Sequence, residues 1–166
     1  MAEAITNNVR KKIIKEHLND PVFYDRMSAL LKEILDDLRA KRIDYELFLK
    51  RMAEVARQVQ AGKADDTPEA LNTPGLRAIY NQLEREWTSA VKNTVAQGSA
   101  TYMAASSDSA LEAALRIDSA VKTRRPDGWR GVLAKERIVK GIINDVVKDA
   151  DKVERIFLIL KAQSEY

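Results

Sequence analysis

Apolar residues spaced three and four apart, with few glycines and prolines between them, constrain this chain more than any other feature of its sequence. The clearest case is a row of large apolar side chains between residues 23 and 38, namely Phe23, Met27, Leu30, Leu31, Ile34, Leu35 and Leu38. This spacing puts side chains on one face of an α-helix, and no segment alternates as a half-buried strand does. With six glycines and four prolines in 166 residues, the sequence predicts an all-α fold, a bundle of about six to eight helices.

Residues that begin and end helices divide this pattern into segments. Asp20 and Thr73 each precede a proline, which is the arrangement favoured at a helix start, and Asp44 is a further candidate cap. Gly62 follows a row of apolar residues and predicts a left-handed helix end. The short connection before Asp44 predicts that the helices on either side of it form an antiparallel hairpin.

The same signals predict two helical subclusters, residues 1–62 and 73–166, joined by a polar linker near 63–72. A stretch near residues 99–107, rich in serine and alanine, has no apolar pattern and is expected to be an irregular loop, with Asp108 capping the next helix.

Two further rows of apolar side chains each predict a helix with one apolar face. The N-terminal row comprises Ile5, Val9, Ile13 and Leu18. A row near the C-terminal end recurs in pairs every four residues: Ile138 and Val139, Ile142 and Ile143, Val146 and Val147.

The residues that catalysis and cofactor binding require are mostly missing. There is no cysteine, and the single histidine, His17, has no second histidine or cysteine with which to share a metal. Gly62-Lys63 lacks the glycines and the serine or threonine of a phosphate-binding loop. Asp127 suggests a nuclease centre, but no lysine has an acid two positions before it. We therefore predict no catalytic, cofactor-binding or metal-binding residues.

Acidic pairs on the predicted helices have a simpler interpretation. Asp36 with Asp37, and Glu84 with Glu86, lie beside well-patterned helices, where a solvated polar face is expected.

One region, residues 122–140, has a concentration of positive charge. It contains seven cations, Lys122, Arg124, Arg125, Arg130, Lys135, Arg137 and Lys140. Against two acids, Asp127 and Glu136, they give this region a local net charge of +5, while the whole chain carries +3. Such a concentration can attract DNA phosphates or an acidic protein face, or can form an ordinary solvated surface. These seven residues are our candidates for partner or DNA binding.

Gly128, Trp129 and Gly131 lie within this region and predict a structural turn between two helices. No other aromatic residue lies among the cations, so we expect Trp129 to pack over the core rather than stack on a base.

No signal peptide and no apolar run of about 18 residues is found, which predicts a cytoplasmic protein with no membrane partner.

Landmarks along almost the entire chain resemble the C-terminal region of type I restriction enzyme R subunits, which combine a motor and a nuclease. The C-terminal landmarks are Asp118, Val121, Trp129-Arg130-Gly131, Lys135, Val139, Ile143, Gln163, Glu165 and Tyr166. The N-terminal ones are Asn7-Asn8-Val9-Arg10, Ile13, Ile14, Pro21, Tyr24, Met27-Ser28, Leu30-Leu31, Tyr45, Leu71-Asn72-Thr73-Pro74, Arg77-Ala78 and Tyr80. The chain departs from the pattern at Val132, where asparagine is expected, and matches poorly from Leu83 to Ser107.

This resemblance implies that residues 1–166 are a single helical C-terminal module, a fragment of a larger R subunit of a restriction-modification system. It implies a non-catalytic role in docking the ATP-dependent DNA translocase and endonuclease subunit to the methyltransferase and specificity subunits. The alternative is a basic, DNA-contacting helical surface that supports the motor domains. The parent enzyme, an ATP-dependent deoxyribonuclease, would use ATP and Mg, but this module would hold neither.

Overall fold

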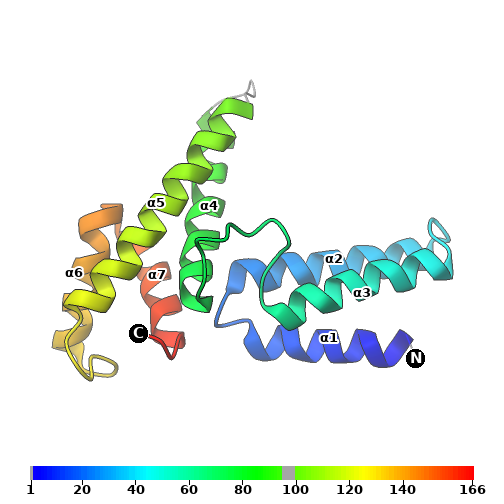
Figure 1. Ribbon diagram of the computed structural model, residues 1–166, viewed down its shortest axis with the longest axis horizontal. Coiled ribbons are helices and arrows are strands. Elements are labelled where there is room, and N and C mark those ends of the chain that lie inside the picture. The colour runs from blue at the N-terminus through cyan, green and yellow to red at the C-terminus, as the bar shows by residue number, and fades with distance from the viewer. Residues whose placement is uncertain (1, 95–99) are drawn as a thin grey trace. The chain divides into compact units, whose positions relative to one another are not determined.

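A computed structural model describes the backbone of residues 2–94 and 100–166, and the side chains of residues 4–89 and 109–166. Within these ranges the chain forms seven helices and no strand, which confirms the predicted all-α fold. The helices belong to two compact units, Met1–Leu71 and Asn72–Tyr166, close to the predicted subclusters (Figure 1). No helix in the described ranges is both long and apolar enough to cross a bilayer.

Unit 1 is a three-helix bundle of α1 (Ala2–Glu16), α2 (Pro21–Arg39) and α3 (Tyr45–Ala61), in which each helix contacts the other two. Asp20 accepts a hydrogen bond from the backbone N–H of Phe23, and Asp44 accepts one from that of Leu47. Gly62 ends α3 with a left-handed φ of 63°. The three predicted boundaries are confirmed, and α2 and α3 form the expected hairpin.

The core of unit 1 is built from one row of each helix. Its large buried side chains are Val9, Ile13, Phe23, Tyr24, Met27, Leu31, Ile34, Phe48, Met52, Val55 and Val59. The prediction of burial was wrong for Leu30, which is 36% exposed; Leu18, the last residue of the first apolar row, is 74% exposed and lies in the turn after α1. Leu30 lies beside the row that α2 buries, which contains Met27, Leu31 and Ile34.

Residues 62–73, between α3 and α4, contain no helix, as the predicted linker requires. Two apolar residues in this segment, Ala64 and Leu71, are nevertheless buried, and Ala64 belongs to the unit 1 core. The segment is therefore packed in part.

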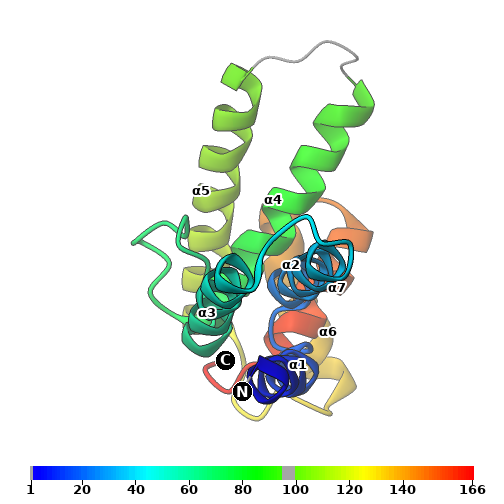
Figure 2. The same ribbon diagram turned by 90° about the vertical axis from the view of Figure 1, so that its right-hand side faces the viewer.

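Unit 2 contains α4 (Pro74–Thr94), α5 (Ala100–Arg124), α6 (Leu133–Val147) and α7 (Ala150–Ala162). The contacts run in a closed cycle, α4 with α5, α5 with α6, α6 with α7, and α7 with α4. Figure 2 shows α4 and α5, the two longest helices of this unit, side by side. This cycle encloses a second core of Leu76, Ile79, Leu83, Ala114, Ile117, Val121, Val139, Ile142, Ile143, Ile156, Phe157 and Leu160.

One prediction for unit 2 was wrong. Residues 100–107, expected to be an irregular loop, belong to α5, and Asp108 lies inside that helix rather than at its start; residue 99 lies outside the described ranges. Alanine has the highest helix propensity, so a segment can be helical without an apolar row. Ile138 is 52% exposed because α6 buries only the row containing Val139 and Ile143.

Candidate functional site

The basic turn, defined here as residues 122–140, connects α5 to α6 in unit 2. α5 ends at Arg124, two residues before Pro126, which has no backbone N–H and disfavours helical geometry in the residue before it. Gly128 and Gly131 have φ angles of 57° and 77°, in the left-handed region that favours glycine. A proline that stops the helix and two glycines that redirect the chain therefore produce the predicted structural turn.

Trp129 lies between these glycines and is only 2% exposed. Its ring packs against that of Phe157 on α7, with 5.6 Å between the ring centroids. The indole Nε1 is buried and has no hydrogen-bond partner among the described residues. The prediction that Trp129 packs over the core is confirmed, and its ring is not presented at the surface.

Arg130 caps the end of α7. Its guanidinium donates hydrogen bonds to the carbonyl oxygens of Lys161 at 3.2 Å, of Leu160 at 3.4 Å and of Gln163. The last carbonyls of a helix have no partner within the helix, and a positive charge there interacts favourably with the helix dipole. The guanidinium also lies over the Trp129 ring, 4.7 Å from its centroid. The hydrogen-bond donors of the Arg130 guanidinium therefore have their partners within unit 2.

Four other cations of the basic turn also have partners within unit 2. Three form ion pairs with acids outside the turn: Lys122 with Asp118 (2.8 Å), Arg124 with Asp145 (3.0 Å) and Lys140 with Glu154 (2.6 Å). The fourth, Lys135, donates to the backbone carbonyl of Asp127 at 2.5 Å. The acids that offset this positive charge could not be seen by counting residues 122–140 alone.

Arg125 and Arg137 are the two remaining candidates, and neither has an ion-pair partner among the described residues. Arg125 also acts on Arg130: burial lowers the pKa of the Arg130 guanidinium, and the positive charge of Arg125 lowers that pKa further. Of the seven candidate cations, five are thus committed to contacts inside the unit, and the surface has fewer available charges than the sequence indicated.

Tyr166 contacts the C-terminal part of α5, which leads into the basic turn. It is 1% exposed, and its hydroxyl donates a hydrogen bond to Asp118, the same carboxylate that pairs with Lys122. The Lys122 ammonium lies 5.2 Å from the centroid of the Tyr166 ring. Burial raises the pKa of the Tyr166 hydroxyl, and the hydrogen bond to Asp118 adds to this effect. Tyr166 therefore remains a neutral donor.

The neighbouring residue, Glu165, binds the backbone at the start of α4. Its carboxylate accepts a hydrogen bond from the backbone N–H of Gly75, and the Thr73 hydroxyl accepts one from the N–H of Leu76 at 3.3 Å. A Cβ at Gly75 would lie 2.5 Å from the Tyr166 ring. Gly75 was not predicted to be important from the sequence, although its position directly after a cap and a proline was an available signal. We call Asp118, Lys122, Gly75, Glu165 and Tyr166 the C-terminal clasp.

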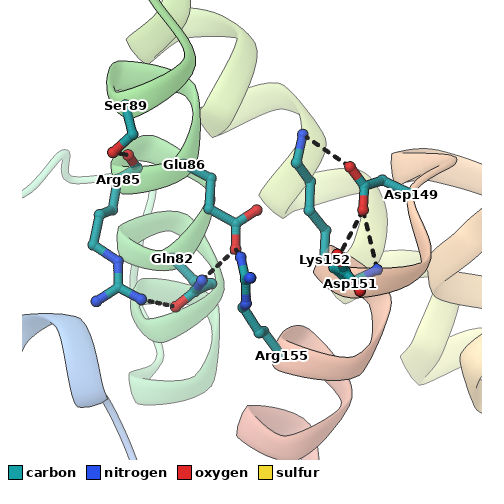
Figure 3. Close-up of polar contacts among 8 residues, drawn as sticks. All are labelled: Gln82, Arg85, Glu86, Ser89, Asp149, Asp151, Lys152 and Arg155. Atoms are coloured by element: carbon teal, nitrogen blue, oxygen red, sulfur yellow. Dashed lines mark hydrogen bonds and ion pairs between the residues drawn. The ribbon is translucent and has the colours of Figure 1, made fainter. Parts of the chain in front are cut away.

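A polar groove of about 450 Å³ lies between α4 and α7, and Figure 3 shows its side chains. Its lining consists of Arg85, Glu86, Ser89, Asp149, Asp151, Lys152 and Arg155. The volume falls within the range of small-molecule sites, about 300–1,000 Å³, so the groove is a second candidate site.

Glu86 connects the two helices across this groove. One carboxylate oxygen accepts hydrogen bonds from Gln82 and, at 2.9 Å, from Arg155 on α7, and the other is buried without a hydrogen-bond partner among the described residues (Figure 3). The ion pair raises the pKa of Arg155. The side chain of Glu86 is only 9% exposed, so the expectation of a solvated face for the pair Glu84 and Glu86 is wrong at Glu86.

Three further charged groups of the groove have hydrogen-bond or ion-pair partners within their own helix or at its start. Asp149 accepts from the backbone N–H groups of Asp151 and Lys152 at the start of α7, and the Lys152 ammonium lies 3.7 Å from its carboxylate. The hydrogen bond from the Lys152 backbone is the largest cause of the lowered pKa of Asp149. Arg85 donates to Gln82 at 3.2 Å. Of the contacts at this groove, the Glu86–Arg155 pair joins α4 to α7, and those of Asp149, Lys152 and Arg85 lie within one helix or at its start.

His17 makes a different contact from the metal ligation considered for it. Its Nε2 lies 2.8 Å from a carboxylate oxygen of Asp25. No group of three or more histidines and acids suited to a metal ion occurs within the described ranges.

Comparisons with protein-family models, with curated proteins and with solved structures found no match to this chain. The resemblance to R subunits therefore remains a prediction from the sequence.

Proposed function

We propose that this chain is a non-catalytic assembly module of a type I restriction enzyme R subunit, acting in the cytoplasm. In this role it docks the ATP-dependent translocase and endonuclease to the core formed by methyltransferase and specificity subunits. ATP and Mg would act in other parts of the parent subunit. The proposal assigns this module a structural task and no chemical step.

The observation that carries this proposal is that landmarks of the resemblance, far apart in sequence, meet in space. Asp118 bonds to Tyr166, Glu165 bonds to Gly75 directly after the Leu71–Pro74 landmark, and Arg130 bonds to the carbonyl of Gln163. A chance similarity gives no reason for scattered landmarks to contact one another. Their convergence supports the resemblance as one to a folded unit rather than to a set of unrelated positions.

Docking is favoured over DNA contact by the charge arrangement. A protein that binds DNA through phosphates gains affinity from each cation that can release a counterion. Five cations of the basic turn already have partners in unit 2, which leaves Arg125 and Arg137 as the side chains that favour the DNA-contacting alternative.

The test is a pair of titrations of the chain, one with the purified methyltransferase core and one with duplex DNA, each at several salt concentrations. We expect saturable binding to the core and no appreciable binding to DNA at physiological salt. Absence of core binding would contradict the proposal.

The DNA alternative has its own signature in the same titrations. It predicts a log-log salt slope of about 0.9 per neutralised phosphate, reduced by about one for each lost contact. Arg125→Glu with Arg137→Glu should then lower DNA affinity. Lys32→Glu with Lys50→Glu, which changes the charge equally at two exposed positions of unit 1, is the matched control.

A further inference from the structure

The side of α1 that faces away from α2 and α3, together with the turn that follows this helix, carries two exposed aliphatic side chains. Ile14 and Leu18 are 71% and 74% exposed, the largest fractions among the exposed large apolar side chains of the described residues. A single exposed aliphatic residue is ordinary; here Ile14 lies near the end of α1 and Leu18 follows in the turn after Glu16, and we call these two side chains the apolar strip.

The geometry of α1 places these residues in the middle of a polar face. With 3.6 residues per turn, Asn7, Lys11 and Ile14 follow one row on the side opposite the buried Val9 and Ile13. Leu18 extends this row into the turn after the helix. Arg10 and Lys15 then fall on opposite edges of the row. We call Asn7, Arg10, Lys11, Ile14, Lys15 and Leu18 the outward face of α1.

The cations of this face differ from most of those in the basic turn because their charges are not held in ion pairs with described residues. Lys12, closer to the bundle, donates to the backbone carbonyl of Gln60 at 3.3 Å. Arg10, Lys11 and Lys15 are exposed, and none has an ion pair with a described residue. Glu3, four residues before Asn7, continues the same row by helix periodicity, so three cations stand against one acid and the face is net positive.

We infer that the outward face of α1 docks an acidic protein surface with a small apolar centre. The apolar strip would meet the apolar centre, and the cations on its edges would meet carboxylates around it, as in interfaces with a dry core and a charged rim. This inference rests on the proposed docking function and assigns its surface to unit 1 rather than to the basic turn.

The aliphatic strip distinguishes this partner from duplex DNA. Phosphates need cations and polar donors, and two exposed aliphatic side chains in the middle of the row would add nothing to phosphate binding. Burying them against a protein would contribute through the hydrophobic effect, while the flanking charges would steer the encounter.

The experiment uses the full chain, with the methyltransferase core as the probe. Ile14→Ser with Leu18→Ser removes the strip without changing charge, and Lys11→Gln with Lys15→Gln removes two edge cations. We expect each pair to weaken core binding at least tenfold and the lysine pair also to reduce its salt dependence. Leu133→Ser with Leu158→Ser, 67% and 62% exposed in the parent, is the matched control and should bind like the parent.

The outcomes separate this inference from the proposed function. If the parent chain does not bind the core, the proposed function is wrong. If the parent binds and the α1 pairs bind equally well, the function stands and the assigned surface is wrong. Two further results would overturn the assignment: loss of duplex DNA binding with the lysine pair alone, or a dimer of the parent chain, seen by sedimentation, that the Ile14 and Leu18 pair abolishes. Circular dichroism checks that each variant is folded.

Discussion

Two regions of this chain are rich in lysine and arginine, and they use these side chains in opposite ways. The basic turn in unit 2 holds five of its seven cations against acids or backbone carbonyls of the same unit. The outward face of α1 in unit 1 holds three cations that have no ion-pair partner among the described residues. Charge density along the sequence therefore does not indicate where a protein presents charge to a partner.

The difference follows from the position of the acids. In unit 2, Asp145 and Glu154 come from α6 and α7 and lie beside cations that precede them in the chain. On α1 the outward row is directed away from the other helices of its bundle, so their acids do not reach it. A cation between packed helices contributes to the fold, and one on an outward row remains available for binding.

The largest expected effect tests whether the basic turn is structural. Trp129→Ala should lower the free energy of unfolding by about 3 to 5 kcal/mol, because it removes a large buried aromatic side chain. Urea denaturation followed by circular dichroism measures this change. A variant as stable as the parent would place the ring outside the core and would favour an interface role for the turn.

Arg130 should contribute through its geometry as well as its charge. Arg130→Ala should lower stability by about 1.5 to 3 kcal/mol, because the carbonyls at the end of α7 lose charged hydrogen-bond donors. Arg130→Lys keeps the charge but not the planar fork, and should recover only part of this loss. Full recovery by lysine in the same denaturation experiment would mean that charge alone is required.

Gly75→Ala tests the C-terminal clasp. The added Cβ would overlap the Tyr166 ring and the Glu165 carboxylate, and overpacking of this kind costs about 1 to 3 kcal/mol. The unfolding midpoint in urea should fall accordingly. Gly141→Ala is the control, since a Cβ there has nothing within 4 Å, and alanine should stabilise the helix.

Acid should weaken unit 2 through Glu136. An ion pair with Lys161 and the backbone N–H of Gly131 lower the pKa of this carboxyl below its ordinary value of 4.5. A group whose pKa is lower in the folded state stabilises the fold above the unfolded pKa and loses that contribution as the pH falls below it. Urea denaturation at pH 7 and at pH 3.5 should show a smaller loss for Glu136→Gln than for the parent, and equal losses would contradict the assignment.

The smallest expected effect concerns α1. Lys11→Glu with Lys15→Glu should change stability by no more than about 0.5 kcal/mol, because neither lysine has an ion pair with a described residue. Arg124→Glu with Lys140→Glu should cost more, about 0.2 to 1 kcal/mol for each exposed pair broken. A larger loss from the α1 variant would remove the contrast between the two regions.

Much of the fold could be predicted because helix boundaries are encoded locally. Asp20, Asp44 and Gly62 lie within a few residues of the backbone groups that they affect, so the sequence identifies them directly. Burial was less predictable. Leu18 and Ile138 are apolar and lie near a regular row, but whether a neighbouring helix covers them depends on tertiary packing.

The candidate site was harder to predict because its contacts are distant in sequence. Trp129 between two glycines was identified from local features alone. In contrast, Glu165 bonds to Gly75 across 90 positions, and Glu86 pairs with Arg155 across 69. No local pattern shows that the clasp needs a glycine at position 75 or that Glu86 is buried.

The burial of Trp129 also gives unit 2 an optical signal of its own. Both tryptophans of the chain, Trp87 and Trp129, belong to this unit, and the buried indole nitrogen of Trp129 has no polar partner among the residues that the structure describes. An indole shielded from water fluoresces at shorter wavelength than a hydrated one. In a Trp87→Phe background, emission would therefore come from Trp129 alone, and its wavelength would follow the detachment of residues 125–132 from the helices beneath them.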